Sequence, residues 1–171
     1  MHEVKMEIKL YGNPVLRKKS KKAEINKDNI ELAKKMIDFM YESKGVGLAA
    51  PQIGINIRLV VIDLYDNTGP KILFNPEIIW KSEEITLFEE GCLSFPGIEL
   101  EFERPARIKY RYYDEKGNCI EKDAKDLEAR AIQHEIDHLD GKLIIDYVST
   151  TKLTIIEKKL KEIRKKGKKQ K

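Results

Sequence analysis

The sequence predicts an α+β fold in which antiparallel or mixed β-sheets pack around a central helix, with one further helix near each end of the chain. Three observations predict it. Residues 28–45 and the segment from about residue 151 carry apolar side chains at helical spacing. Residues 58–114 contain several strand-like stretches joined by short turns, which favour an antiparallel or mixed sheet. Residues 126–141 then form the remaining helical stretch.

The composition is that of one folded, water-soluble protein. The 171 residues are 41% hydrophobic and 36% charged, enough to build a core without disulfides. No segment reaches the roughly 18 consecutive apolar residues that a membrane span needs, and the N-terminus lacks the apolar core of a secretory signal. We therefore expect a cytoplasmic protein. Two cysteines, Cys92 and Cys119, argue against a disulfide scaffold and leave room for a reduced thiol with a chemical role.

The charge is distributed unevenly along the chain. The net charge is only +4, yet residues 158–171 hold nine Lys or Arg against one Glu. No internal repeat or domain boundary is visible elsewhere. We expect a single domain in residues 1–157, followed by a basic C-terminal tail at 158–171 whose final lysine run is disordered.

The first helix is expected to begin near Asp28, which can cap it, and to end at Gly45. Its apolar stripe is formed by Ile30, Ala33, Ile37, Met40 and Tyr41. The following stretch GVGLAAPQIG (45–54) has too little bulk for a core strand and too many breakers for a helix. We expect a loop there that something approaches closely.

Four strands are expected next, each rich in β-branched or aromatic residues and bounded by turn residues. They are RLVVIDL (58–64), KILFNPEII (71–79), EEITLFEEGCLS (83–94) and LEFERPARIKYRYYD (100–114). The central helix should begin near Asp126 and stop at Gly141, a plausible C-terminal cap. The last helix should place Leu153, Ile156, Leu160 and Ile163 on one face.

The motif QHEIDHLDG (133–141) carries the chemistry of the central helix. His134 and His138 are four residues apart, so their imidazoles lie on one helical face and suit a transition metal. Glu135 is placed to reach a water on that metal and act as a general base. The competing interpretation is two ordinary histidines, because HExxH is a short pattern.

A metal site that acts on water needs a third protein ligand and an open position. Cys92 is the strongest candidate, because it lies in a Gly-flanked turn after a strand and its thiolate is a soft ligand. The alternative is that Cys92 is a small buried hydrophobe. The other residues formally available are Asp137, Asp140, Asp146 and His2.

Three motifs together resemble a known family. GVGLAAPQ (45–52), EGCLS (90–94) and QHEIDHLDG (133–141), in this order, are similar to the signature motifs of bacterial peptide deformylases. YGNPVLRKKS resembles the opening segment of that family, so the likeness covers roughly residues 6–150. The resemblance implies a catalytic domain in residues 1–157 that hydrolyses the N-formyl group from the initiator methionine of new polypeptides and releases formate.

The resemblance also implies the site residues. One metal ion would be held by Cys92, His134 and His138. Glu135 would act as base and then acid, while the Gln52 side chain and the Leu93 backbone N–H would donate to the oxyanion. The substrate would be bound by Val46, Gly47, Phe88, Glu90, Gly91, Leu127 and Ala131.

Several neighbouring residues keep two interpretations. Glu90 could tie the metal loop to Arg104 or another donor. Gln133 and Asp137 could orient the ligands, and Asp137 could equally be a surface charge. Arg130 departs from an all-apolar pocket wall, so it either alters the pocket rim or points to solvent.

The metal and the partners follow from ligand chemistry and from the resemblance. One Cys and two His would ordinarily indicate zinc, whereas the resemblance implies Fe²⁺, with Ni²⁺ or Co²⁺ as active substitutes. The expected partners are N-formyl-methionyl nascent peptides and, through the basic C-terminus, ribosomal RNA. The alternative for the C-terminus is a solubilising tail without a partner. We expect no membrane or DNA partner.

Two other functions compete with this hypothesis. A small HExxH metallopeptidase would take its third ligand C-terminal to the motif, where there is no histidine and where Glu157 and Glu162 lie on an exposed helix face. A structural metal module that binds RNA would need four protein ligands and would have to recruit Cys119.

Overall fold

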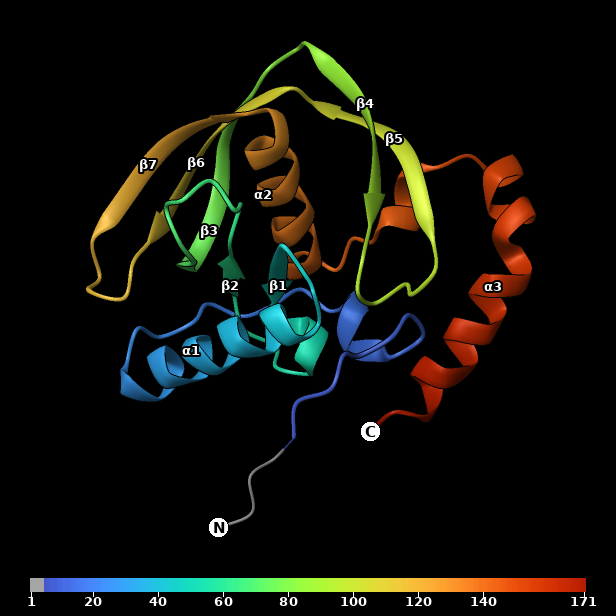
Figure 1. Ribbon diagram of the computed structural model, residues 1–171, viewed down its shortest axis with the longest axis horizontal. Coiled ribbons are helices and arrows are strands. Elements are labelled where there is room, and N and C mark those ends of the chain that lie inside the picture. The colour runs from blue at the N-terminus through green and yellow to red at the C-terminus, as the bar shows by residue number, and fades with distance from the viewer. Residues whose placement is uncertain (1–4) are drawn as a thin grey trace.

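The computed structural model describes residues 5–171, and it confirms the α+β class (Figure 1). A five-stranded antiparallel sheet has the order β1-β2-β3-β6-β7, and a separate hairpin pairs β4 with β5. The strands are β1 (Gly47–Ala49), β2 (Leu59–Ile62), β3 (Lys71–Lys81), β4 (Ile85–Gly91), β5 (Glu99–Pro105), β6 (Arg107–Tyr113) and β7 (Cys119–Lys125). The helices are α1 (Lys27–Glu42), α2 (Asp126–Leu139) and α3 (Thr150–Lys169).

The sheet is covered on both faces, and β2 shows why its sequence is continuously apolar. Val60 and Ile62 pack in one hydrophobic cluster with α2, whereas Leu59 and Val61 pack in another with α1. Alternate residues of a strand point to opposite faces, so a strand between two helices must be apolar throughout. Helix α1 is capped by Asn26 and not by Asp28 as expected, because the Asn26 side chain accepts from the Asn29 N–H at 2.9 Å, and the helix ends at Glu42 rather than at Gly45.

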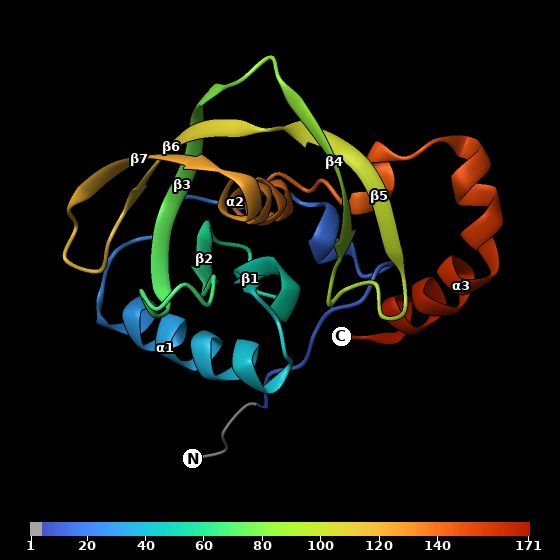
Figure 2. The ribbon, with the colours of Figure 1, turned by 45° about the horizontal axis from the view of Figure 1, so that its top comes forward.

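Helix α2 lies between the five-stranded sheet and the β4–β5 hairpin, in the centre of the molecule (Figure 2). It starts directly after β7 and ends at Leu139, as its sequence predicts. Gly141 adopts φ +73°, and a Cβ there would lie 2.7 Å from the Arg17 carbonyl oxygen. The left-handed turn at Gly141 therefore ends the helix and brings the chain against the N-terminal arm.

The expectation of a single strand at 100–114 is wrong. Pro105 ends β5, Ala106 donates its N–H to the Glu84 carbonyl at 2.9 Å, and Arg107 begins β6 in the other sheet. Apolar alternation continues through this break, so it cannot reveal that the chain changes sheets. Strand β7 was not expected, because its sequence CIEKDAK is the charged sequence of an exposed sheet edge.

The expectation of a loop at 45–54 is also wrong in part. Residues Gly47–Ala49 form β1 at the edge of the sheet, and Ala50–Ile53 form a 3-10 turn. A Cβ on Gly47 would lie 2.4 Å from Oε2 of Glu135. The small residues therefore let an edge strand lie directly against α2.

The final lysine run, which was expected to be disordered, is helical instead. Helix α3 runs through the proposed boundary at residue 157 and continues to Lys169. Leu160, Ile163 and Gly167 are buried, and a Cβ on Gly167 would lie 2.1 Å from the Tyr11 carbonyl oxygen. The Gln170 side chain then accepts from the Leu10 N–H at 2.7 Å and donates to the Ile8 carbonyl at 2.8 Å. In the part of the chain that the structure describes, no helix is long and apolar enough to cross a membrane.

Candidate metal centre and substrate cleft

The three expected ligands come together from two distant segments. Cys92 directly follows β4, while His134 and His138 lie one turn apart on α2. Sγ of Cys92 lies 3.4 Å from Nε2 of His138, which lies 3.2 Å from Nε2 of His134. All three ligand atoms lie within 4.8 Å of one another. This is the only group of three such side chains within residues 5–171 that could hold a metal ion.

The carboxylates considered as alternative ligands are already paired with arginines. Asp137 pairs with Arg104 at 2.8 Å, and Asp140 pairs with Arg58 at 3.0 Å. Asp146 pairs with Arg17 at 2.7 Å and accepts the Leu143 N–H at 2.9 Å. His2, the remaining candidate, lies outside the described residues.

The donor set fits a transition metal with one open position, because a thiolate and two imidazoles leave the fourth tetrahedral position to water or substrate. Nδ1 of His134 lies 2.8 Å from Oε1 of Glu90. When Nδ1 donates its proton to Glu90, Nε2 of His134 is left free to coordinate. Burial lowers the pKa of His134, but Cys92 and Glu90 outweigh burial and raise that pKa well above its ordinary value. At His138, by contrast, burial lowers the pKa well below its ordinary value.

A buried ionic network supports His134 from the side away from Cys92. Arg104 binds Glu90 through two hydrogen bonds, at 2.5 and 3.0 Å, and binds Asp137 through a third. Tyr147 donates to Asp137 at 2.6 Å. Burial opposes ionisation of Glu90, but the hydrogen bonds from His134 and Arg104 outweigh burial and lower its pKa to about 2. Glu90 is therefore the anion that orients His134, and Asp137 is not a free surface charge.

Arg130 does not point to solvent, since the residue is 6% exposed. Its guanidinium donates to the carbonyl of Thr86 at 3.0 Å, to that of Phe88 at 2.9 Å and to that of Phe102. Its Nε lies 2.5 Å from Oε2 of Glu90. The hydrogen bonds of Arg130 therefore connect α2 to both strands of the β4–β5 hairpin, beside the cleft. Gln133 also bridges the two, donating to the Pro105 carbonyl at 3.0 Å.

Glu135 is a buried carboxyl without a partner on one oxygen. The residue is 5% exposed, and its Oε1 forms no hydrogen bond within residues 5–171. Burial raises the pKa of Glu135 to about 7. A buried carboxyl with this pKa can take up and release a proton near neutral pH, which is what a general base and acid requires.

The Gln52 amide is held with its donor end toward the metal ligands. Its Oε1 accepts the Ala49 N–H at 3.0 Å, so Nε2 must face the other way. Nε2 donates to Oγ of Ser94 at 3.2 Å and lies 3.7 Å from Sγ of Cys92. Leu93 packs close to Gly45, where a Cβ would lie 3.0 Å from the Leu93 side chain.

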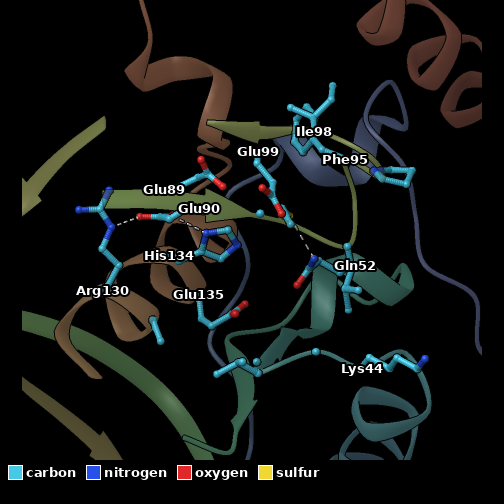
Figure 3. Close-up of a pocket in the computed structure, with 18 of the residues that line it drawn as sticks. Lys44, Gln52, Glu89, Glu90, Phe95, Ile98, Glu99, Arg130, His134 and Glu135 are labelled. Carbon is cyan, nitrogen blue, oxygen red and sulfur yellow. Dashed lines mark hydrogen bonds and ion pairs between the residues drawn. The ribbon is translucent and has the colours of Figure 1, made fainter. Parts of the chain in front are cut away.

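These side chains surround one cleft of about 680 Å³ (Figure 3). Every site residue expected from the sequence lines it except His138, which is buried beneath. The expected residues that line it are Val46, Gly47, Gln52, Phe88, Glu90, Gly91, Cys92, Leu93, Leu127, Ala131, His134 and Glu135. The expectation missed Lys44, Glu89 and the wall formed by Phe95–Glu99. The only signal for that wall was its position, directly after EGCLS.

Comparison with known proteins gives one family throughout. The polypeptide deformylase family matches residues 5–154. A peptide deformylase from Endomicrobium trichonymphae is 49% identical over 165 residues, which cover 95% of this chain and 98% of that protein. One from Thermotoga petrophila is 47% identical over 157 residues, 91% of this chain and 94% of that protein.

A solved structure agrees with the sequence matches. The crystal structure of peptide deformylase from Thermus thermophilus superposes with a TM-score of 0.87 at 39% sequence identity. The match covers 94% of this chain and 98% of that one.

Proposed function

Because the chain belongs to the polypeptide deformylase family, we propose that it hydrolyses the N-formyl group from the initiator methionine of newly synthesised polypeptides. The products are formate and a peptide with a free α-amine. The observation that carries the proposal is the group Cys92, His134 and His138 at the cleft, with the buried carboxyl of Glu135 beside it, whose Oε1 has no hydrogen-bond partner within residues 5–171. That arrangement suits the activation of water next to a bound carbonyl.

Glu135 performs the proton transfers. Cys92, His134 and His138 would hold a metal ion, which would supply polarisation of the formyl carbonyl and a lowered pKa of water. Glu135 accepts a proton from the attacking water as the bond to the formyl carbon forms. The same carboxyl then delivers a proton to the leaving nitrogen as the C–N bond breaks. The pKa of about 7 supports both steps at neutral pH.

The oxyanion that develops on the formyl oxygen needs donors aimed at it. We assign them to Nε2 of Gln52, which its own contacts orient toward Cys92, and to the Leu93 backbone N–H. Each such donor stabilises the transition state by about 3 kcal/mol in comparable sites.

The peptide binds beside β1, which is an edge strand of the sheet. An edge strand offers unpaired backbone groups to an extended peptide, so Val46 and Gly47 hold its main chain. Phe88 and Leu127 are 56% and 53% exposed although they are large and apolar. We propose that these two, with Ala131 and Gly91, enclose the unbranched methionine side chain.

We propose one Fe²⁺ per chain as the native cofactor, with Zn²⁺, Ni²⁺ or Co²⁺ as substitutes. A thiolate and two imidazoles accept all four ions, so availability decides which is bound. Metal analysis of protein purified anaerobically tests this assignment. Cys92→Ala should bind substoichiometric metal, and full stoichiometry in a folded Cys92→Ala protein would remove Cys92 from the ligand set.

The decisive test of the activity is formate release from formyl-Met-Ala-Ser by anaerobically prepared, iron-loaded protein. Acetyl-Met-Ala-Ser serves as the control, because it presents the same peptide without a formyl group. A metallopeptidase would instead cleave between residues of either peptide. A structural metal module would release nothing, and it would need Cys119, which is exposed and outside the group of ligands.

We further propose that the enzyme works in the cytoplasm, where its substrates emerge from the ribosome, and that the lysines of α3 contact ribosomal RNA. Deleting residues 158–171 would also remove the packed Leu160, Ile163 and Gly167, so charge removal is the cleaner test. The combined variant Lys158→Gln, Lys161→Gln, Lys165→Gln changes three exposed side chains. It should co-sediment less with ribosomes at low salt while releasing formate normally. Equal co-sedimentation would exclude these lysines as a docking element.

A further inference from the structure

Two residues that do not line the cleft, Tyr41 and Asp63, hold the segment that leads into β1. Tyr41 lies in the last turn of α1, and Asp63 directly follows β2. The Tyr41 hydroxyl donates to Oδ2 of Asp63 at 2.5 Å. Their hydrogen bond therefore joins the end of α1, from which the chain passes to β1, to the end of β2, which pairs with β1.

The same two residues also bind the main chain between α1 and β1. The Lys44 N–H donates to the Tyr41 carbonyl at 3.0 Å, and the Asp63 N–H donates to the Val46 carbonyl at 2.9 Å. Lys44 has φ +59°, a conformation that is unfavourable for a residue with a Cβ and persists only where surrounding contacts impose it. The Tyr41–Asp63 bond supplies such a contact, because it fixes the distance between the two ends of segment 44–46.

The carboxylate of Asp63 is itself held firmly. The residue is 7% exposed, and its Oδ1 accepts from the Tyr65 N–H at 2.8 Å while Oδ2 accepts from Tyr41. The hydrogen bond to Asp63 raises the pKa of Tyr41 to about 12, so the hydroxyl keeps its proton and remains the donor. Both oxygens of a buried carboxylate are thus satisfied, as such groups require.

The backbone that this arrangement positions belongs to Gly47. Antiparallel pairing places Gly47 opposite Ile62, and the Val46 carbonyl points to β2 because it accepts from Asp63. Neighbouring residues of a strand turn their backbone groups to opposite edges, so the N–H and C=O of Gly47 face the open edge of β1. Val46 and Gly47 line the cleft, and Figure 3 shows the adjacent Lys44 on the side away from the β4–β5 hairpin. A shift of segment 44–46 would therefore displace the groups that a peptide main chain meets.

We propose that Tyr41 and Asp63 are positioning residues for the substrate, whose hydrogen bond fixes Val46 and Gly47 where an extended peptide pairs with β1. This inference rests on the proposed deformylase activity and adds residues that act through β1. Pairing with a strand edge needs a main chain that extends beyond the methionine. The effect should therefore appear in KM for peptides, with little change in kcat.

The test compares formate release from formyl-Met-Ala-Ser and from formyl-methioninamide, which has no residue after methionine. Tyr41→Phe removes only the hydroxyl. It should raise KM for formyl-Met-Ala-Ser about threefold to tenfold, as expected for one lost hydrogen bond, and leave kcat within about twofold of native. For formyl-methioninamide, kcat/KM should also stay within about twofold of native. An equal change for both substrates, or no change for either, would overturn the inference.

Substitutions of Asp63 test whether the two residues act as a pair. In Asp63→Asn the amide can donate to the Tyr41 oxygen, so its KM for the peptide should stay closer to native than that of Tyr41→Phe. Asp63→Ala loses the bond, and adding Tyr41→Phe to it should raise KM by less than about 1.5-fold further. Multiplicative effects in the combined variant would overturn the inference. If Asp63→Ala does not fold, the comparison of Tyr41→Phe with Asp63→Asn still decides it.

The matched control is Asp66→Ala, which removes a carboxylate three residues further along the same loop. Oδ1 of Asp66 accepts from the Thr68 N–H at 3.1 Å, within the loop itself. This variant should leave both substrates within about twofold of native, and a selective rise of KM for the peptide here as well would overturn the role of the Tyr41–Asp63 bond. Unchanged KM in folded Tyr41→Phe would overturn the inference alone, whereas no formate from either substrate with native protein would overturn the proposed function.

Discussion

Helices α2 and α3 have similar amphipathic sequences but opposite environments. Helix α2 buries eight of its 14 residues, including the polar or charged Arg130, Gln133, Glu135 and His138. Helix α3 buries three of its 20 residues, none of them polar: Leu160, Ile163 and Gly167. None of the charged side chains of α3 is buried. Those of α2 need partners from other elements, chiefly the β4–β5 hairpin, and the active cleft exists where those partners meet.

The energetics of the two helices differ for the same reason. On α3, Lys161 and Glu157 form an i,i+4 pair at 3.4 Å with both side chains more than half exposed, a pair worth at most a few tenths of a kcal/mol. Around α2, Glu90 and Arg104 are almost fully enclosed. Removing one partner there leaves a buried charge with part of its network missing, which costs several kcal/mol.

Arg104→Met should give the largest effect. It leaves Glu90 and Asp137 without their main partner, so the free energy of unfolding measured with urea should fall by about 3–5 kcal/mol. The control is Arg111→Met, because Arg111 pairs with Glu77 and Glu121 at a half-exposed surface and should cost less than about 1 kcal/mol. Similar losses in the two variants would contradict the distinction between buried and surface pairs.

Glu135→Gln should separate chemistry from structure on α2. The amide preserves the shape but cannot accept the proton, so kcat for formate release should fall on the order of 100-fold or more, while the metal content stays native. Glu157→Gln on α3 is the matched control and should have native kcat. Activity of Glu135→Gln within a few-fold of native would refute the assigned proton transfer.

Acidification should weaken the network around α2 through Glu90. The pKa of Glu90 is lowered to about 2 in the folded protein from an ordinary 4.5. Its stabilisation, about 3 kcal/mol, is therefore complete above about pH 4.5 and is lost as the pH falls toward 2. Urea unfolding of metal-free protein between pH 6 and pH 3 should show about 2 kcal/mol of this loss. The curve of Glu90→Gln should be flatter, and parallel curves would exclude Glu90 as the source.

Gly167→Val should give the smallest effect and tests how α3 is attached. A side chain at this position meets the carbonyl oxygens of Tyr11 and Leu10, so the end of α3 must shift, at about 1–3 kcal/mol. Lys165→Ala, which changes an exposed residue, should be nearly neutral. Hydrogen exchange of the last two turns of α3 should accelerate in Gly167→Val alone. Unchanged protection would mean that the contact of Gly167 with Leu10 and Tyr11 does not hold the helix in place.

Local sequence determined a large part of the protein. The presence of α1, the extent of α2, the start of α3 and the placement of His134 and His138 on one face of α2 could all be predicted, and so could the position of Cys92 beside them. Helical periodicity, capping and the HExxH spacing depend on residues within a few positions of one another, so they can be recognised without knowing how the rest of the chain folds. The order of the three motifs in the chain then indicated the family.

Contacts between distant segments decided the rest. The break at Ala106, the edge strand β7 and the docking of α3 on the N-terminal arm depend on which surfaces meet, and no local pattern records that. Arg130 illustrates the point: its sequence context allowed a rim or a solvent position, and only the carbonyls of the β4–β5 hairpin determined that it is buried. Glu89 and Glu99 are separated by ten positions in the chain, and only the register of the hairpin brings their charges to one cleft.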